Sequence, residues 1–181
     1  MPTVFLGLGS NIDPEQNLRE AARMLRLREG TICFSSVYRT KAQGYGDQPD
    51  FLNAAARLET DDPPEVVKAE LEAIERALGK AIPFRFGPRT IDLDLLLYGN
   101  MILPSAEEWR DVCVRWRDAP VGLLYVPHPR MHERRFVLEP LLELNNPEEH
   151  HPVLGRSWHE LLGKCASQEC AKTTLQWHTH A

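Results

Sequence analysis

The fold is decided by the stretch Arg85-Phe86-Gly87-Pro88-Arg89-Thr90-Ile91-Asp92-Leu93-Asp94-Leu95-Leu96-Leu97-Tyr98. Its second half is rich in leucine and long enough to cross a sheet, which predicts a buried strand. Because side chains alternate along a strand, the stretch has two faces. One face carries Ile91, Leu93, Leu95 and Leu97. The other carries Asp92 and Asp94, about 6–7 Å apart at the rise of a strand.

Two carboxylates beside an apolar run repel each other and resist desolvation, and a bound cation relieves both costs. Oxygen ligands favour Mg²⁺, which takes one or two carboxylates together with substrate phosphates. Arg85 and Arg89 flank a Gly-Pro turn just upstream. Carboxylates for metal beside arginines for phosphate are typical of phosphoryl transfer. The alternative is the solvated face of an edge strand with two surface ion pairs.

Length and composition indicate a single globular domain. The chain has 181 residues, of which 43% are hydrophobic and 26% are charged, enough for a continuous core. No apolar run approaches the roughly 20 residues that span a bilayer, so we expect no membrane partner. The N-terminus lacks the features of a signal peptide. The four cysteines have no Cys-x-x-Cys spacing and are expected to be reduced thiols of a cytoplasmic protein.

The net charge of −5 argues against a nucleic-acid partner, since a general nucleic-acid surface needs a basic face. A nucleotide site on an acidic protein must gather its positive charge locally. The candidate cations are Arg85, Arg89, Arg130, Arg134 and Arg135. A P-loop is excluded because its Gly-x-x-x-x-Gly-Lys-Ser/Thr motif is absent, and the protein-kinase motifs are missing as well.

The order of the expected elements is β-α-β-β-α-β. Strands are expected at 3–9, 31–39, 51–59 and 91–98, and helices at 14–28 and 61–78. This order predicts an α+β fold in which helices cover an antiparallel sheet. A short strand at 101–104 and helices at 137–144 and 157–164 are expected to follow. Segment 105–123 reads as an excursion or a short amphipathic helix without a functional interpretation, and the polar tail from Gln168 is expected to be loosely held.

Three further features are candidates for a site. Phe51 and Asn53 share a strand face, which suits a flat heterocycle, although a core phenylalanine with a structural asparagine is an equal alternative. The polar loop 40–50 is long enough to act as a lid. Glu75 is either a functional acid or, as the default, a solvent-facing carboxylate.

The loop 127–136 carries two histidines four residues apart, His128 and His132. They would bind a metal if they were helical. Pro129 disfavours helix at His128, so a histidine and an arginine presented to phosphate is the preferred interpretation.

Five blocks stand in order over about residues 3–144, which is three quarters of the chain. They are Leu8-Gly9-Ser10-Asn11, Ser35-Ser36-Val37-Tyr38-Arg39-Thr40, Asp47-Gln48-Pro49-Asp50-Phe51-Leu52-Asn53-Ala54, Gly87-Pro88-Arg89-Thr90-Ile91-Asp92-Leu93-Asp94 and Pro127-His128-Pro129-Arg130-Met131-His132-Glu133-Arg134. Together they resemble the 6-hydroxymethyl-7,8-dihydropterin pyrophosphokinase family of folate biosynthesis. The resemblance implies a ferredoxin-like fold and a transferase that moves pyrophosphate from ATP to the pterin hydroxymethyl group, releasing AMP.

The resemblance also implies roles for residues. Asp92 and Asp94 match the residues that hold the family's two magnesium ions. The residues that match the pterin site are Thr40, Gln43, Phe51, Asn53 and Phe136. Those that match the ATP site are Glu75, Lys80, Arg85, Arg89, Leu95, Tyr125, His128 and Arg134. Catalysis is expected from Asp94, Arg89, Arg85 and His128, and loops 40–50 and 80–88 match the family's mobile loops. The alcohol proton passes either to Asp94 or away by metal-assisted deprotonation.

This sequence departs from the family in two places. Lys80, Ile82 and Phe86 stand where the well-known bacterial form has arginines and a tryptophan, and segment 105–123 is longer than the usual connection. Two other functions compete with the pyrophosphokinase. One is a catalytically silent pterin- or nucleotide-binding protein, and the other is a metal-dependent phosphohydrolase. The expected partners are small molecules only, and we expect a monomer.

Overall fold

The computed structural model describes residues 1–27, 31–42, 48–80, 87–115 and 122–177. Its strands are β1 (Thr3–Ser10), β2 (Ile32–Phe34), β3 (Tyr38–Thr40), β4 (Phe51–Glu59), β5 (Asp92–Tyr98) and β6 (Ala171–Lys172). Its α-helices are α1 (Pro14–Arg26), α2 (Pro64–Ala77), α3 (Ala106–Val114), α4 (Arg135–Leu142) and α5 (Trp158–Lys164), and a 3-10 helix, η2, covers Met131–Glu133. None of the helices in these ranges has both the length and the apolar content needed to cross a membrane.

The sheet is antiparallel, with the order β5-β1-β4-β3-β6, and β2 also pairs with β4. This is the ferredoxin-like α+β arrangement that the element order predicts. The single strand predicted at 31–39 is wrong in one respect, because it is divided into β2 and β3. At the break the hydroxyl of Ser35 accepts a hydrogen bond from Ala55 N at 2.9 Å. A side chain there takes the place of a backbone carbonyl and interrupts the ladder.

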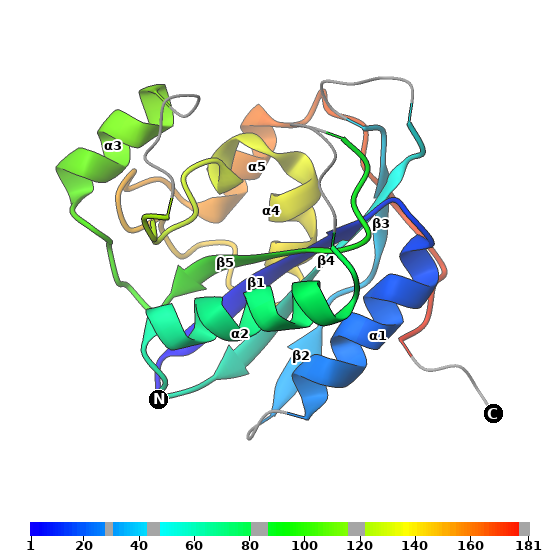
Figure 1. Ribbon diagram of the computed structural model, residues 1–181. Coiled ribbons are helices and arrows are strands. Elements are labelled where there is room, and N and C mark those ends of the chain that lie inside the picture. Colours follow the sequence, from blue (N-terminus) through cyan, green and yellow to red (C-terminus); the bar gives the residue numbers. More distant parts are fainter. Residues whose placement is uncertain (28–30, 43–47, 81–86, 116–121, 178–181) are drawn as a thin grey trace.

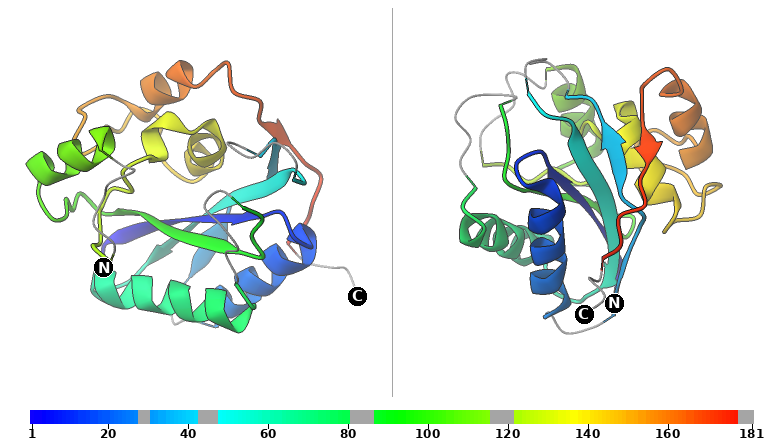
Figure 2. Two further views of the ribbon diagram at one scale, coloured as in Figure 1. Left: turned by 45° about the horizontal axis from the view of Figure 1, so that its top comes forward. Right: turned by 90° about the vertical axis from the view of Figure 1, so that its right-hand side faces the viewer.

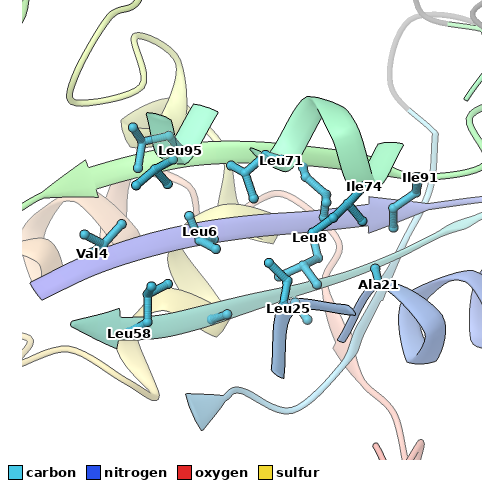
Figure 3. Close-up of a cluster of buried hydrophobic side chains, with 14 of the residues drawn as sticks. Val4, Leu6, Leu8, Ala21, Leu25, Leu58, Leu71, Ile74, Ile91 and Leu95 are labelled. Carbon is cyan, nitrogen blue, oxygen red and sulfur yellow. The ribbon is translucent and has the colours of Figure 1, made fainter. Parts of the chain in front are cut away.

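The helices form a layer on each face of the sheet, as the views of Figure 2 show. α1 and α2 cover one face, where an apolar cluster includes Leu6, Leu18, Leu71 and Ile91 (Figures 1 and 3). α4 and α5 cover the other face over a second cluster that includes Phe5.

A β-bulge in the pairing of β5 with β1 changes the face of its last residues. Leu6 pairs with Leu95 while Phe5 pairs with Leu97, so Leu96 is the extra residue. Leu97 therefore packs with Phe5 under α4 and α5. The prediction that Leu97 shares a face with Leu95 is wrong, because strict alternation does not hold across a bulge.

The C-terminal tail is attached to the edge of the sheet, so the expectation of a loosely held tail is wrong for its described part. β6 pairs with β3, and Thr173 N donates to Val37 O at 2.8 Å. Lys172 Nζ donates to Glu143 Oε1 at 2.8 Å. Trp177 Nε1 donates to Ser35 O at 2.7 Å. The polar composition of the tail concealed these contacts because most of them are to backbone atoms.

We expect Trp177→Ala to lower the free energy of unfolding by about 1–3 kcal/mol. The change removes the hydrogen bond to Ser35 O and the ring contact with Phe34, whose centroid lies 4.9 Å away. Urea unfolding of both proteins measures the difference. Gln176→Ala, at an exposed neighbour, is the control and should change stability by less than about 0.5 kcal/mol. Equal stability of Trp177→Ala and the parent protein would mean that the contacts of Trp177 do not stabilise the fold.

Candidate active site

The candidate site lies on the sheet face that α4 covers in part. The register pairs Asp94 with Gly7 and Asp92 with Gly9, and Gly9 in turn with Asn53 on β4. Opposite residues of an antiparallel pair point to the same face, so both aspartates and Asn53 share it, with Gly7 and Gly9 between them. A Cβ at Gly9 would lie 3.1 Å from Asn53 Oδ1. Because Gly7 and Gly9 have no side chains, no β1 side chain at these two positions fills the space between the carboxylates and the carboxamide.

Asp92 is held by two cations. Lys80 Nζ donates to its Oδ1 at 2.7 Å, and Arg89 donates to its Oδ2. Burial would raise the pKa of Asp92, but Arg89 and Lys80 outweigh burial and hold the pKa below its usual value. The carboxylate is therefore ionised, and its side chain keeps 23% of its surface exposed. Asp94, two residues on, is half-buried on the same face.

Glu75 is buried, which contradicts the default of a solvent-facing carboxylate. Its Oε1 accepts from Leu93 N at 2.7 Å and from Lys80 Nζ at 2.6 Å. β5 is an edge strand, so the Leu93 N–H points away from the sheet and needs such an acceptor. Burial raises the pKa of Glu75, and the bonds from Lys80 and Leu93 oppose this only in part. Glu75 therefore links α2 to β5 through Leu93 N, and to Asp92 through Lys80.

A basic group faces the two aspartates from the segment before α4. Arg134 is half-buried, and its Nε is buried and has no hydrogen-bond partner among the described residues. Burial and the charge of Arg130 lower the pKa of Arg134, while Asp94 and Asp92 raise it and Arg89 lowers it. The Arg134 guanidinium also lies 5.6 Å from the centre of the Phe136 ring. A guanidinium with a buried, unused donor is suited to an anionic ligand.

Two hydrogen bonds with backbone groups fix His128. Its N–H donates to Leu96 O at 2.9 Å, and its Nδ1 accepts from Arg130 N at 3.2 Å. Because Nδ1 accepts, Nε2 carries the proton of the neutral ring. Burial lowers the pKa of His128, Asp94 opposes this, and Arg134 adds to it. His128 is thus a neutral donor between carboxylates and arginines.

The other end of the site is built for a polar edge. Asn53 Nδ2 donates to Thr40 Oγ1 at 2.9 Å, and both side chains are buried. Thr40 pairs with Phe51, which is half-buried and lies two residues before Asn53. α4 packs over β4 and β3, and Phe136 stands in its first turn. The carboxamide is therefore oriented, with an aromatic ring beside it.

Asn11 is a site-forming residue to which sequence reasoning assigned no role. Its Oδ1 accepts from Arg89 N at 2.7 Å, and its Nδ2 donates to Gln48 Oε1 at 3.0 Å and to Pro49 O at 3.1 Å. It is buried, with 2% of its surface exposed. One carboxamide therefore joins the end of β1 to the chain before β4 and to the chain before β5. Its position in the block Leu8-Gly9-Ser10-Asn11 was the available signal.

Other predicted residues have different outcomes. Leu95 is buried in the apolar cluster under α1 and α2, so its side chain does not lie on the face of the two aspartates, and its contact with ATP stays a prediction. Tyr125 is half-buried before a single β-bridge between Val126 and Leu103, which is all that forms of the strand predicted at 101–104. Gln43 and Arg85 lie outside the described residues, as do 43–47 of loop 40–50 and 81–86 of loop 80–88.

The arrangement can neutralise and orient a polyphosphate. Two carboxylates offer oxygen ligands, and Arg89, Arg134 and His128 offer donors around them. Among the described residues, no group of three or more histidine, cysteine, aspartate or glutamate side chains is gathered for a metal ion. The carboxylate pair suits Mg²⁺, which completes its shell with water and substrate oxygens.

Comparison with known proteins gives one consistent result. Residues 5–146 match the family model described as 7,8-dihydro-6-hydroxymethylpterin-pyrophosphokinase (HPPK). The chain is 37% identical over 147 residues to 2-amino-4-hydroxy-6-hydroxymethyldihydropteridine pyrophosphokinase of Haemophilus influenzae, covering 80% of this chain and 82% of that protein. It is 38% identical over 143 residues to the Bacillus subtilis protein of the same name, covering 77% and 76% of the two chains.

Solved structures show the same fold. A crystal structure of an HPPK-DHPS in complex with substrates matches with a TM-score of 0.66 at 14% identity, over 90% of this chain and 43% of that one. Wild-type HPPK-DHPS of Plasmodium falciparum matches with a TM-score of 0.65 at 15% identity, over 90% and 44%. The chain therefore spans less than half the length of these proteins.

Proposed function

The chain belongs to the 7,8-dihydro-6-hydroxymethylpterin-pyrophosphokinase family of folate biosynthesis, and from this premise we propose how its own residues carry out the transfer. The hydroxymethyl oxygen of the pterin attacks the β-phosphorus of ATP. The new bond joins that oxygen to the β-phosphorus, the bond from the β-phosphorus to the bridging oxygen of the α-phosphate breaks, and AMP leaves. The proton of the alcohol passes to Asp94 or, by metal-assisted deprotonation, to solvent.

One observation carries the proposal. Asp92, Asp94 and the oriented carboxamide of Asn53 share one face of the sheet, and Arg89, His128 and Arg134 interact with the two aspartates. We place a nucleotide polyphosphate at the end of this face near the aspartates and a flat polar ring at the end near Asn53. The transfer needs both reactants in line, and positioning supplies most of the catalysis in phosphoryl transfer.

We assign the polyphosphate to Arg89, His128 and Arg134. Arg134 has an unused buried donor, and His128 presents its Nε2–H without adding a charge. Asp92 and Asp94 would hold two Mg²⁺ ions. When bound, these ions would neutralise the triphosphate and lower the cost of charge that develops on its oxygens.

We propose that Lys80 and Arg89 exchange one anionic partner, Asp92, for another, the phosphates. In the free protein they neutralise Asp92, which otherwise stands ionised in a half-buried place. We propose that both would turn to the phosphates when Asp92 holds a metal ion. Lys80 keeps a partner in either state, because Glu75 Oε1 lies 2.6 Å from its Nζ.

We assign the pterin ring to the other end of the face. Asn53 and Thr40 are bonded to each other, so the carboxamide edge is fixed before the ring binds. Phe51 and Phe136 would stack on the two sides of the ring. From the family resemblance alone, we assign Gln43 to the pterin and Arg85 to the phosphates.

The reaction is tested by measuring AMP from ATP, Mg²⁺ and 6-hydroxymethyl-7,8-dihydropterin with the purified protein. We expect one AMP and one pterin diphosphate per ATP consumed, and no AMP when the pterin is left out. Tight pterin or nucleotide binding without AMP would identify a silent binding protein. ATP hydrolysis that is independent of the pterin would identify a phosphohydrolase.

Phe51→Ala is expected to weaken pterin binding by about 1–3 kcal/mol, because the mutation removes one stacking surface. Fluorescence titration with the pterin measures the affinity. Phe34→Ala, on β2 and packed against Trp177, is the control that should cost stability but leave pterin affinity unchanged. An unaltered affinity in Phe51→Ala would make Phe51 a core residue only.

The proposal also covers the compartment, the oligomeric state and the partners of the protein. The described cysteines Cys33, Cys113, Cys165 and Cys170 are all free thiols, which supports a reducing compartment such as the cytoplasm. We propose that residues 1–181 act as one domain and as a monomer. The partners are then ATP and the pterin alone.

A further inference from the structure

α3 lies on the same side of the sheet as α4, beside the chain that leads into η2 (Figures 1 and 2). Its N-terminus is capped by Ser105, whose hydroxyl accepts from Glu108 N at 3.2 Å. Trp109 and Val112 are buried, while Glu107, Glu108, Arg110 and Asp111 are exposed. One side of this helix therefore packs on the protein and the other side meets solvent.

The packed side makes two hydrogen bonds to a single tripeptide. Trp109 Nε1 donates to Pro127 O at 2.5 Å, and Cys113 Sγ donates to Pro129 O at 3.0 Å. The two donors are four residues apart, which places them on one side of the helix. Their acceptors are the residues immediately before and after His128. The His128 N–H itself donates to Leu96 O at 2.9 Å.

Both donors are held in the state that donates. Burial, and then Glu133, raise the pKa of the Cys113 thiol to about 12, so the thiol stays protonated at neutral pH. The Trp109 side chain is fully buried, and its ring lies 5.0 Å from that of His151 and 5.6 Å from that of His132. The indole is thus fixed from behind by a residue of the chain before α5 and by η2.

We propose that Trp109 and Cys113 are positioning residues for ATP: they fix the two carbonyls that flank His128 and so aim its Nε2–H at the polyphosphate. The inference rests on the proposed role of His128. It assigns a function to α3, which lies in the segment 105–123 for which no functional interpretation was available from sequence. Neither residue touches the substrates, so their loss acts through His128 and not through chemistry of their own.

The test compares variants in the AMP assay, with ATP and the pterin varied separately. Cys113→Ala removes one donor and is expected to raise KM for ATP about fivefold, and Trp109→Phe, which keeps the ring and loses the N–H, about tenfold. KM for the pterin should stay within about twofold in both, since Asn53 and Thr40 are anchored elsewhere. Cys113→Ser restores a donor and should return KM for ATP to within about twofold of the parent value.

A matched control is Val114→Ala, the exposed neighbour of Cys113 on the same helix, which should leave every constant unchanged. The inference is overturned if Cys113→Ala and Trp109→Phe lower the melting temperature but leave KM for ATP as it was. It is also overturned if both Michaelis constants rise together, because that pattern indicates general loosening. Failure of the parent protein to release AMP would instead refute the proposed function.

Discussion

Asp94→Ala is expected to reduce the rate of AMP formation by at least about 10³-fold while the protein remains folded. Asp94 is a half-buried carboxylate opposite Gly7, on the face that Arg134 and His128 line. Its removal takes away half of the oxygen ligands that the chain offers to Mg²⁺. It also relieves repulsion from Asp92, so the free energy of unfolding should not fall.

The rate is measured as AMP released per enzyme at saturating ATP, pterin and Mg²⁺, and folding is checked by urea unfolding. Asp61→Ala provides the matched control, because Asp61 is an exposed aspartate whose side chain keeps 74% of its surface exposed. It should be as active as the parent protein. Near-normal turnover by Asp94→Ala would show that the metal site has been assigned to the wrong residues.

The second large effect is expected at Arg134. Arg134→Ala should weaken ATP binding by about 100- to 1,000-fold, since a buried charge-assisted contact with phosphate is lost. In the free protein this half-buried guanidinium has a buried, unpaired Nε, and partial burial of its charge adds to the cost. The variant should therefore be no less stable than the parent protein, so affinity and stability should separate.

Calorimetric titration with α,β-methylene-ATP measures this affinity. Arg134→Lys keeps the charge but loses the planar fork, and an intermediate affinity is expected. Arg115→Ala serves as the control, because Arg115 is an exposed arginine paired with Asp111 at 2.7 Å. If Arg134→Ala binds the analogue as tightly as the parent protein does, the phosphates lie elsewhere.

The alternation of side chains along a strand was enough to predict which site residues share a face of the sheet. The alternation of Asp92 and Asp94 against a run of leucines placed both carboxylates on one face, and the two-residue spacing of Phe51 and Asn53 did the same on β4. The element order predicted the ferredoxin-like sheet. These inferences need only the period of a strand and the order of the elements.

Features that depend on distant contacts were not predictable from the sequence. The bulge at Leu96 depends on how β5 meets β1, and the burial of Glu75 depends on an outward N–H of an edge strand. Lys80 is twelve residues from Asp92 and reaches it through space. Trp109 bonds a carbonyl eighteen residues away. No periodicity in the chain encodes such pairs.

The central claim is that Asp92 and Asp94 hold the metal ions that bind the nucleotide. It is tested most directly by a crystal structure with Mn²⁺, α,β-methylene-ATP and the pterin, in which anomalous scattering locates the ions. We predict anomalous peaks within about 2.0–2.3 Å of oxygens of both aspartates, with Lys80 and Arg89 turned from Asp92 to the phosphates. Peaks elsewhere, with Asp92 still bonded to Lys80 and Arg89, would contradict the account.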